Sequence, residues 1–260
     1  MNRDLARAYA FLDRGDMAGD RTESSSVGTA VFVDSLPLRL DSNFLRVERD
    51  AEAETVRAEA ERLGRRAIFV PDEKLGERLV PFFEERGWRV NRTVVMAQRR
   101  EPDREAPPVR VVEVEEEALR PARCQVVAGQ PWAAPEVMEQ LFAGKHRIAE
   151  RLQVRYFAVE VDGAPVSYTD LYQAGTEAQV EDVGTLHEHR GRGYATAVVL
   201  AAIAEARRDG AEFVCLVADY EDWPKELYRR LGFDELGYYL KFIAPGSHSS
   251  SPACRYRKLR

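Results

Sequence analysis

Hydrophobic residues follow two kinds of spacing over residues 109–243, and each kind predicts a different element. Apolar residues that recur at helical spacing predict four helices, whereas short apolar runs bounded by turn residues predict six strands. The predicted helices begin near residue 116 and cover residues 135–152, 191–208 and 222–231. The predicted strands are residues 109–114, 156–161, 166–172, 178–186, 212–218 and 233–242.

Turn and cap residues support these boundaries. Asp162-Gly163 supplies the positive φ values of a tight turn, which predicts a β-hairpin between the second and third strands. Asp209-Gly210 ends the alanine-rich helix, and Gly232 suits a left-handed helix cap. The predicted order is strand, two helices, three strands, helix, strand, helix and strand, which indicates an α/β fold.

A polar segment divides the chain. Residues 100–108 hold three prolines between two apolar runs, which is typical of an interdomain linker. Residues 244–260 are rich in Ser, Pro and Gly and have little to bury, so they are predicted to be a disordered tail. The predicted folded regions are therefore residues 1–99 and 109–243.

Composition excludes several classes of protein. The chain has 260 residues, 45% of them hydrophobic and 32% charged, which suits one large or two small globular domains. It lacks an apolar run of roughly 18 residues and an evident secretion signal, so a cytoplasmic protein without a membrane partner is expected. Three scattered cysteines indicate neither a disulfide framework nor a zinc site. A net charge of −6 argues against nucleic-acid binding, although the last eight residues are basic.

The most informative segment is a glycine loop between a predicted strand and a predicted helix. Gly191, Gly193 and the small Ala195 let the backbone turn sharply and approach a ligand closely. The free N–H groups of the first helical turn favour an anion such as pyrophosphate, and Arg190 and Arg192 add positive charge. The spacing fits neither a Walker loop nor a dinucleotide fingerprint.

Two motifs in this region resemble the GNAT superfamily of acyl-coenzyme A-dependent N-acetyltransferases. The pattern Arg190-x-x-Gly193-x-Ala195 resembles the family's loop, [RQ]-x-x-G-x-[GA]. About 30 residues later, residues 227–233 (LYRRLGF) reproduce the family's L-Y-x-x-x-G-F. The resemblance covers about residues 109–243 and implies a mixed, mostly antiparallel central sheet flanked by helices.

The resemblance also implies a site for acetyl-coenzyme A as co-substrate, without a metal. In the family, coenzyme A lies in a V-shaped opening between the fourth and fifth strands, with its pantetheine paired to the end of the fourth. The corresponding coenzyme-binding residues are Thr185, Leu186, His187, Arg190, Gly191, Arg192, Gly193, Tyr194, Ala195 and Thr196.

Tyr228 is the candidate general acid, because the family's tyrosine protonates the departing thiolate. The base is less well specified, since Gln179 stands where the family often has a glutamate. Strict strand alternation places Glu181 on the face of Gln179, with Val183 and Thr185, and Asp182 on the opposite face with Val180. Glu181 is therefore the first candidate base and Asp182 the second.

The first half shows the rhythm of a degenerate repeat. Aligning Gly87 with Gly232 gives both halves a helix, an apolar strand, a helix, a glycine followed by an aromatic residue, and a strand. Residues 47–54 hold four carboxylates and no glycine where the second half has its loop, and Phe83 stands in the place of Tyr228. We therefore expect residues 1–99 not to bind coenzyme A but to pack against the second half and shape the acceptor site. An unrelated α/β domain of similar rhythm is the alternative.

The motifs together predict an N-acetyltransferase that acts by direct attack of an amine. Acidic residues near the site suit a cationic amine, either a small molecule or a protein amine. These residues are Glu181, Asp182, Asp219, Glu221 and Asp222. Trp132 either lines the acceptor pocket or anchors packing. A non-catalytic acyl-coenzyme A sensor is the main alternative, and a binding module that uses the basic tail is a weaker one. The oligomeric state stays open, with a homodimer among the alternatives.

Overall fold

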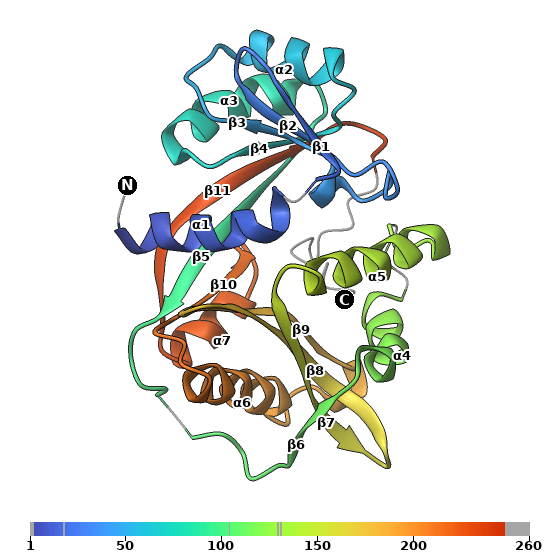
Figure 1. Cartoon of the computed structure of the whole chain (residues 1–260), viewed down its shortest axis with the longest axis vertical. Helices are drawn as coiled ribbons and strands as arrows, with labels where there is room; N and C mark the ends of the chain where they lie inside the picture. Colours follow the sequence, from blue (N-terminus) through green and yellow to red (C-terminus); the bar gives the residue numbers. More distant parts are fainter. Residues whose placement is uncertain (1–2, 18, 104, 129, 131, 248–260) are drawn as a thin grey trace.

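The computed structural model describes residues 3–17, 19–103, 105–128, 130 and 132–247. Within them, eleven strands form one continuous sheet in the order β1-β2-β3-β4-β11-β5-β10-β9-β8-β7-β6 (Figure 1). Eight of its ten strand pairs are antiparallel, which confirms the predicted mixed, mostly antiparallel sheet. The strands are β1 (Arg21–Ser24), β2 (Gly28–Phe32), β3 (Leu45–Val47), β4 (Ala67–Val70), β5 (Arg89–Gln98), β6 (Val111–Val114), β7 (Gln153–Val161), β8 (Ala164–Ala174), β9 (Glu177–Thr185), β10 (Phe213–Asp219) and β11 (Phe233–Ile243).

The helices agree with the predicted order and differ from it at their ends. α6 begins at Tyr194 rather than at residue 191, because Gly191 and Gly193 take positive φ and stay outside the helix. The helices are α1 (Arg3–Asp16), α2 (Ala53–Arg62), α3 (Glu73–Glu85), α4 (Glu116–Val127), α5 (Pro135–Ala149), α6 (Tyr194–Arg208) and α7 (Pro224–Arg230), with short 3₁₀ turns at 40–42 and 187–189. No helix in the described part of the chain is long and apolar enough to cross a membrane.

The two halves exchange their last strands at the centre of the sheet. β5, the last strand of the first half, lies between β10 and β11, and β11, the last strand of the second half, lies between β4 and β5. β5 and β11 pair antiparallel from Arg89 opposite Ile243 to Gln98 opposite Phe233. Each half therefore completes its part of the sheet with a strand from the other half.

Both faces of this central pair are buried. Val94 and Met96 of β5 pack on the side of α6 and α7, whereas Val95 and Ala97 pack against α1 on the other side. This alternation is what a strand covered on both faces requires. α1 crosses β5 and β11, while α2 and α3 cover the strands of the first half (Figure 1).

β9 and β10 diverge after a short parallel contact. They pair only from Glu177 opposite Phe213 to Gln179 opposite Cys215, although β9 continues to Thr185 and β10 to Asp219. The sheet is therefore open between these two strands at their carboxyl ends, where the resemblance implies the coenzyme.

A β-bulge interrupts β9 beside this opening. The pairing of β8 with β9 shifts between Tyr168 and Asp170, and Asp182 takes a φ of 50°. A bulge adds a residue to one strand and changes the face on which the following side chains lie. Strict alternation along residues 179–186 was therefore a wrong prediction.

The polar segment 100–108 connects β5 to β6 without regular structure in its described residues. Pro107 of this segment lies against the glycine loop, since a side chain on Gly193 would contact its ring at 3.0 Å. The predicted disordered tail falls, from residue 248 onward, outside the described residues.

Candidate active site

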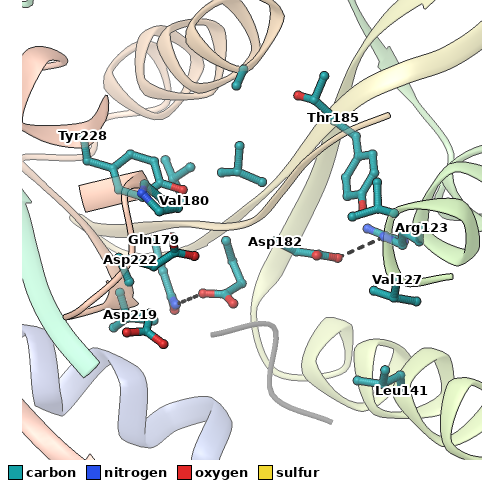
Figure 2. Close-up of a pocket in the computed structure, with 18 of the residues that line it drawn as sticks. Arg123, Val127, Leu141, Gln179, Val180, Asp182, Thr185, Asp219, Asp222 and Tyr228 are labelled. Carbon is teal, nitrogen blue, oxygen red and sulfur yellow. Dashed lines mark hydrogen bonds and ion pairs between the residues drawn. The ribbon is translucent and has the colours of Figure 1, made fainter. Parts of the chain in front are cut away.

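The described residues enclose a cavity of about 490 Å³ to which both halves contribute (Figure 2). The second half supplies β9 from Gln179 to Asp182, the start of α6, the beginning of α7, and side chains of α4 and α5. The first half contributes Phe11, Leu12, Gly15, Arg39 and Asp41. The first half thus forms part of the wall of the same cavity that holds the predicted site.

The cavity includes most of the predicted coenzyme loop. Gly191 and Gly193 have φ values of 74° and 79°, and Gly193 is the N-cap of α6. The N–H groups of the first helical turn have no partner within the helix, so they can bind an anion. The predicted residues that line the cavity are Thr185, Arg190, Gly191, Gly193, Tyr194, Ala195 and Thr196.

The other three predicted coenzyme residues do not line the cavity. Leu186 is buried in the core that lies against α6. His187 is exposed in the 3₁₀ turn, and Arg192 binds the carbonyl of Glu188. Within the described residues, no group of three or more His, Cys, Asp or Glu side chains is arranged to hold a metal ion.

Tyr228 lies in the wall of the cavity. Its side chain is 7% exposed and packs edge-on against Phe233 at a ring distance of 6.1 Å. Figure 2 shows its ring pointing into the cavity from α7, at the side of β9 that carries Gln179. This position suits a donor that reaches an atom bound between β9 and β10.

Glu181 also lines the cavity, and a neighbouring amide orients its carboxylate. Gln179 donates from Nε2 to Glu181 Oε2 over 2.6 Å. The two residues lie two positions apart on the same face of β9, as the sequence predicts. Gln179 cannot act as a base, but it fixes the direction of the carboxylate beside it.

Asp182 lies on the face of Glu181, not on the opposite face. The bulge turns its carboxylate toward α4 and α5, where Oδ2 lies 3.1 Å from Arg123 Nε and 2.8 Å from Lys145 Nζ. The placement with Val180 that strict alternation predicts is therefore wrong, because the positive φ of the bulge reverses the side chain.

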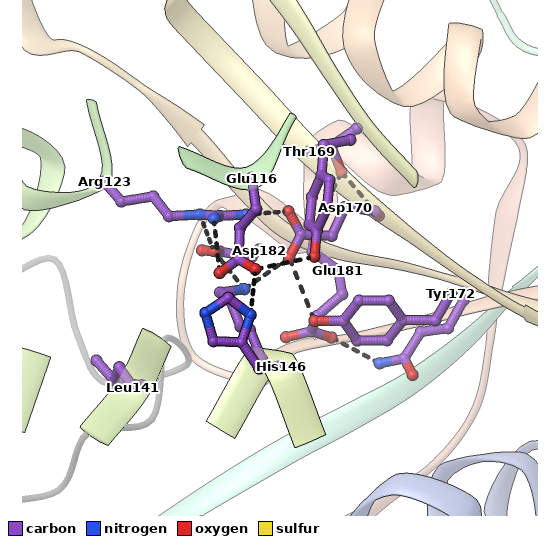
Figure 3. A network of polar contacts seen from close by, with 12 residues as sticks. Glu116, Arg123, Leu141, His146, Thr169, Asp170, Tyr172, Glu181 and Asp182 are labelled. Atoms are coloured by element: carbon purple, nitrogen blue, oxygen red, sulfur yellow. Dashed lines mark hydrogen bonds and ion pairs between the residues drawn. The ribbon is translucent and has the colours of Figure 1, made fainter. Parts of the chain in front are cut away.

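Asp182 belongs to a buried polar network (Figure 3). Asp170 of β8, which is fully buried, accepts hydrogen bonds from Arg123, from Lys145 at 2.6 Å and from the hydroxyl of Tyr172 at 3.2 Å. Glu116 lies 3.8 Å from Arg123 Nη1. The network thus joins α4 and α5 to the two strands beside the cavity.

Charge pairing sets the protonation of this network. Burial alone would raise the pKa of Asp182, but attraction to Lys145 and Arg123 holds it below its usual value. Burial alone would lower the pKa of Lys145, but Asp170 and Asp182 hold it above its usual value. Burial and the nearby carboxylates raise the pKa of Tyr172 well above that of a free phenol. Asp182 is therefore ionised, and Lys145 and Tyr172 are protonated, at neutral pH.

The remaining residues singled out from the sequence are divided between cavity and surface. Asp219 and Asp222 line the cavity, whereas Glu221 is exposed and lies 3.8 Å from Arg92. Trp132 both lines the cavity and packs in a small cluster with α5. Trp132 therefore both lines the pocket and anchors packing, the two roles considered for it from the sequence.

Sequence reasoning missed Arg123, Lys145 and Arg39. Arg123 and Lys145 lie on helices whose apolar spacing gives no sign that a charged residue points inward, and both are largely buried. Arg39 precedes a 3₁₀ turn in a segment with no regular pattern. A signal was present only in Gly144, which gives space to Arg39 and is unusual in the middle of a helix.

The matching position in the first half is filled. Phe83 of α3 corresponds to Tyr228 of α7, since each helix leads into an exchanged strand. Phe83 is fully buried, with its ring against Trp88 at 5.0 Å and Phe242 at 4.7 Å. Between β3 and α2, the segment that corresponds to the glycine loop carries carboxylates, and Asp50 pairs with Arg78. At these two positions the first half therefore differs from the second, with a phenylalanine in place of Tyr228 and carboxylates in place of the glycine loop.

Comparison with known proteins agrees with this geometry. Residues 114–233 match the family model described as acetyltransferase (GNAT) family. No curated protein matches the sequence significantly. The full chain is similar to a solved GCN5-related N-acetyltransferase from Kribbella flavida, with 20% identity, a TM-score of 0.64, and coverage of 95% of this chain and 98% of that one.

Two further solved structures show the same fold over most of the chain. A functionally unknown conserved protein from Staphylococcus epidermidis has 16% identity and a TM-score of 0.66, with coverage of 88% of this chain and 94% of that one. A tandem GNAT protein from the clavulanic acid biosynthesis pathway has 14% identity and a TM-score of 0.54, with coverage of 93% and 95%. The chain therefore has a tandem GNAT-like fold, and its residues 114–233 form a domain of the GNAT acetyltransferase family.

Proposed function

We propose that the protein transfers the acetyl group of acetyl-coenzyme A to an amine by direct attack. One observation carries the proposal: the glycine loop at the start of α6, the carboxylate of Glu181 and the hydroxyl-bearing side chain of Tyr228 all line one cavity. An anion-binding helix terminus, a base and an acid are the three groups that such a transfer needs.

Acetyl-coenzyme A fits the opening between β9 and β10. The strands stop pairing after Gln179, so the backbone from there to Thr185 has no partner on β10. The pantetheine would pair with this edge and end at Thr185. The pyrophosphate would then meet the N–H groups of residues 191–196, with Arg190 beside them.

The amine nitrogen attacks the thioester carbonyl carbon, and the carbon–sulfur bond breaks. Glu181, or a water that it orders, takes the proton that the amine must lose. Tyr228 donates its hydroxyl proton to the departing thiolate. A positioned acid or base typically accelerates such a step by about 10²–10⁴-fold.

Asp182 is the weaker candidate for the base. Its carboxylate already pairs with Arg123 and Lys145, and its lowered pKa makes it a poor proton acceptor. We assign it instead to holding α4 and α5 against the bulge. Residues 1–99 are assigned no coenzyme site, because Phe83 and the carboxylates near residue 50 replace the groups that bind and protonate the coenzyme.

Calorimetric titration of acetyl-coenzyme A tests the proposal. The wild-type protein should bind it, and Gly193→Asp should not, because the new side chain brings negative charge to the loop and contacts Pro107. Gly163→Asp is the matched control, since Gly163 also has positive φ but faces open space in a distant hairpin turn.

Failure of the wild-type protein to bind acetyl-coenzyme A would overturn the proposal. Binding without acetylation of any amine in a broad panel would support the alternative, a non-catalytic sensor, in which Gln179 marks the lost base.

A further inference from the structure

The cavity has a second, largely apolar region that the transfer reaction does not explain. It is walled by α1 of the first half and by α5 with the residues that follow it. Its side chains are Phe11, Leu12, Met138, Leu141, Phe142, Ile148 and Leu152. Such a wall suits an apolar group that is withdrawn from water.

Arg39 brings a positive charge into this apolar region. Its Nη1 makes one long contact, 3.5 Å to the carbonyl of Leu141, and its Nε is buried without a hydrogen-bond partner. Among the side chains that the structure describes, no carboxylate lies within ion-pair distance of Arg39. A buried N–H group without an acceptor is costly, because it has lost its hydration, and the Nε of Arg39 is such a group.

The fold makes room for this guanidinium group. Gly144 of α5 faces it, and a Cβ at that position would overlap the Arg39 side chain. Glycine in the middle of a helix makes the helix less stable than alanine would. The glycine therefore keeps open a position for Arg39 at the cavity wall.

The nearest carboxylate of the same segment is already engaged. Asp41 binds Lys241 of β11 at 2.7 Å. Burial alone would raise the pKa of Asp41, but Lys241, Arg39 and Arg89 together hold it below its usual value. Asp41 is thus paired with Lys241, and Arg39 brings a further positive charge to this part of the wall.

Arg39 and the candidate base line the same cavity. Tyr172 belongs to the lining of that cavity as well. An acceptor whose amine meets Glu181 can therefore place a second group near Arg39.

From this geometry we infer that the acceptor is a small amine that also carries a carboxylate and an apolar side chain, as in an apolar α-amino acid. Arg39 binds the carboxylate, and the apolar wall of α1 and α5 takes the side chain. The inference rests on the proposed function, since it names the acceptor of the same transfer. A guanidinium group matches a carboxylate with two parallel hydrogen bonds, which an amide or an unsubstituted amine cannot replace.

The test compares each of leucine, methionine and phenylalanine with its α-carboxamide. Each pair keeps the amine and the side chain and differs in the charge that Arg39 would bind. The full-length wild-type protein should have a kcat/KM for the acids about 10–100-fold above that for the amides, as expected for a charged hydrogen-bonded pair. Phenethylamine, which has no carboxyl group, should behave as the amides do.

Three variants assign the preference to Arg39. Arg39→Gln should reduce the acid-to-amide ratio toward one, mainly by lowering kcat/KM for the acids. Gly144→Ala should reduce the ratio as well, because it displaces the guanidinium group while favouring the helix. Arg78→Gln is the control, since Arg78 is an exposed first-half arginine that pairs with Asp50 away from the cavity.

The outcomes separate this inference from the proposed function. Equal turnover of acids and amides by the wild type, or an unchanged ratio in Arg39→Gln, would overturn the inference and leave the transferase standing. Acetylation of other amines but of none of these acids would also overturn the inference and leave the transferase standing. Calorimetric titration of the acids and amides into protein saturated with coenzyme A measures the carboxylate preference without acyl transfer, so a failure of turnover does not hide the result.

Discussion

Gln179 Nε2 donates a hydrogen bond to Glu181 Oε2 over 2.6 Å, inside the cavity and along one face of β9. The position that the family often fills with a glutamate thus orients a carboxylate two residues further along the strand. The bulge that follows turns Asp182 away to Arg123 and Lys145. Of the two carboxylates, Asp182 is the one that the structure pairs with these cations.

Glu181→Gln should lower kcat by about 10²–10⁴-fold, because the amide keeps the shape of the side chain but cannot accept the amine proton. Steady-state kinetics over a pH series is the measurement, and the remaining rate should rise with pH as the free amine fraction increases. Acetyl-coenzyme A affinity should stay within a few-fold of wild type. A variant with unchanged kcat would assign the base to another group.

Gln179→Ala should have a smaller effect on kcat than Glu181→Gln, because it removes the orientation of the carboxylate but not the carboxylate. The loss expected from one charged hydrogen bond is about 1.5–3 kcal/mol, or roughly 10–150-fold. The double variant should be no slower than Glu181→Gln alone. If the loss in the double variant equals the sum of the losses in the two single variants, Gln179 acts independently of Glu181.

Tyr228→Phe should lower kcat by about 10²–10⁴-fold with little change in acetyl-coenzyme A affinity, because the ring stays and only the proton donor is lost. A thioester with a more acidic thiol should be less affected by the substitution, since its leaving group needs less protonation. Tyr220→Phe is the control: its ring packs on Tyr238 outside the cavity lining. Normal turnover of Tyr228→Phe would remove the role of the tyrosine as acid.

Asp170→Asn should destabilise the protein by about 3–5 kcal/mol, because it leaves buried cations without their shared carboxylate. Denaturant unfolding followed by tryptophan fluorescence gives the free energy of unfolding. Adding Lys145→Met to Asp170→Asn should recover part of the loss, since one of the two cations that Asp170 pairs with is then absent. If the second substitution makes the protein still less stable, the network is not held by charge pairing.

Asp182 should make the free energy of unfolding depend on pH in the acid range. Its folded-state pKa lies below its usual value, so its contribution is complete above the unfolded-state pKa of about 3.9 and is lost as pH falls through the lower folded-state value. The stability difference between wild type and Asp182→Asn should be constant near neutral pH and narrow below about pH 4. A stability difference between wild type and Asp182→Asn that grows as the pH falls would contradict the lowered pKa of Asp182.

The second half of the fold follows from the sequence because its signals are local. The hairpin at Asp162-Gly163, the glycine loop and the cap at Gly232 each depend on a few neighbouring residues, and all three have the predicted positive φ values. The helix and strand rhythm shared by the halves is local in the same way. Residues 73–85 and 224–230 therefore show the same element before the exchanged strands.

The exchange of β5 and β11 is not visible in the sequence. A strand buried on both faces has the same apolar pattern whichever neighbours it has, and the choice of neighbours depends on contacts more than 130 residues apart, as between Gln98 and Phe233. The bulge at Asp182 has no glycine to mark it. The network of Arg123 and Lys145 forms only when two helices and two strands meet, so no single segment predicts it.

The exchanged strands also determine whether one half of the chain can be deleted. Each half supplies the other with an interior strand, so deletion of residues 1–99 would leave β10 and β11 with an empty place between them. The second half needs β5 to complete its sheet. The first half is therefore required for the fold even where it supplies no group for the chemistry. The place of β5 in the sheet holds the first half in the fold independently of any chemistry, so its cavity-facing residues can diversify without loss of that place.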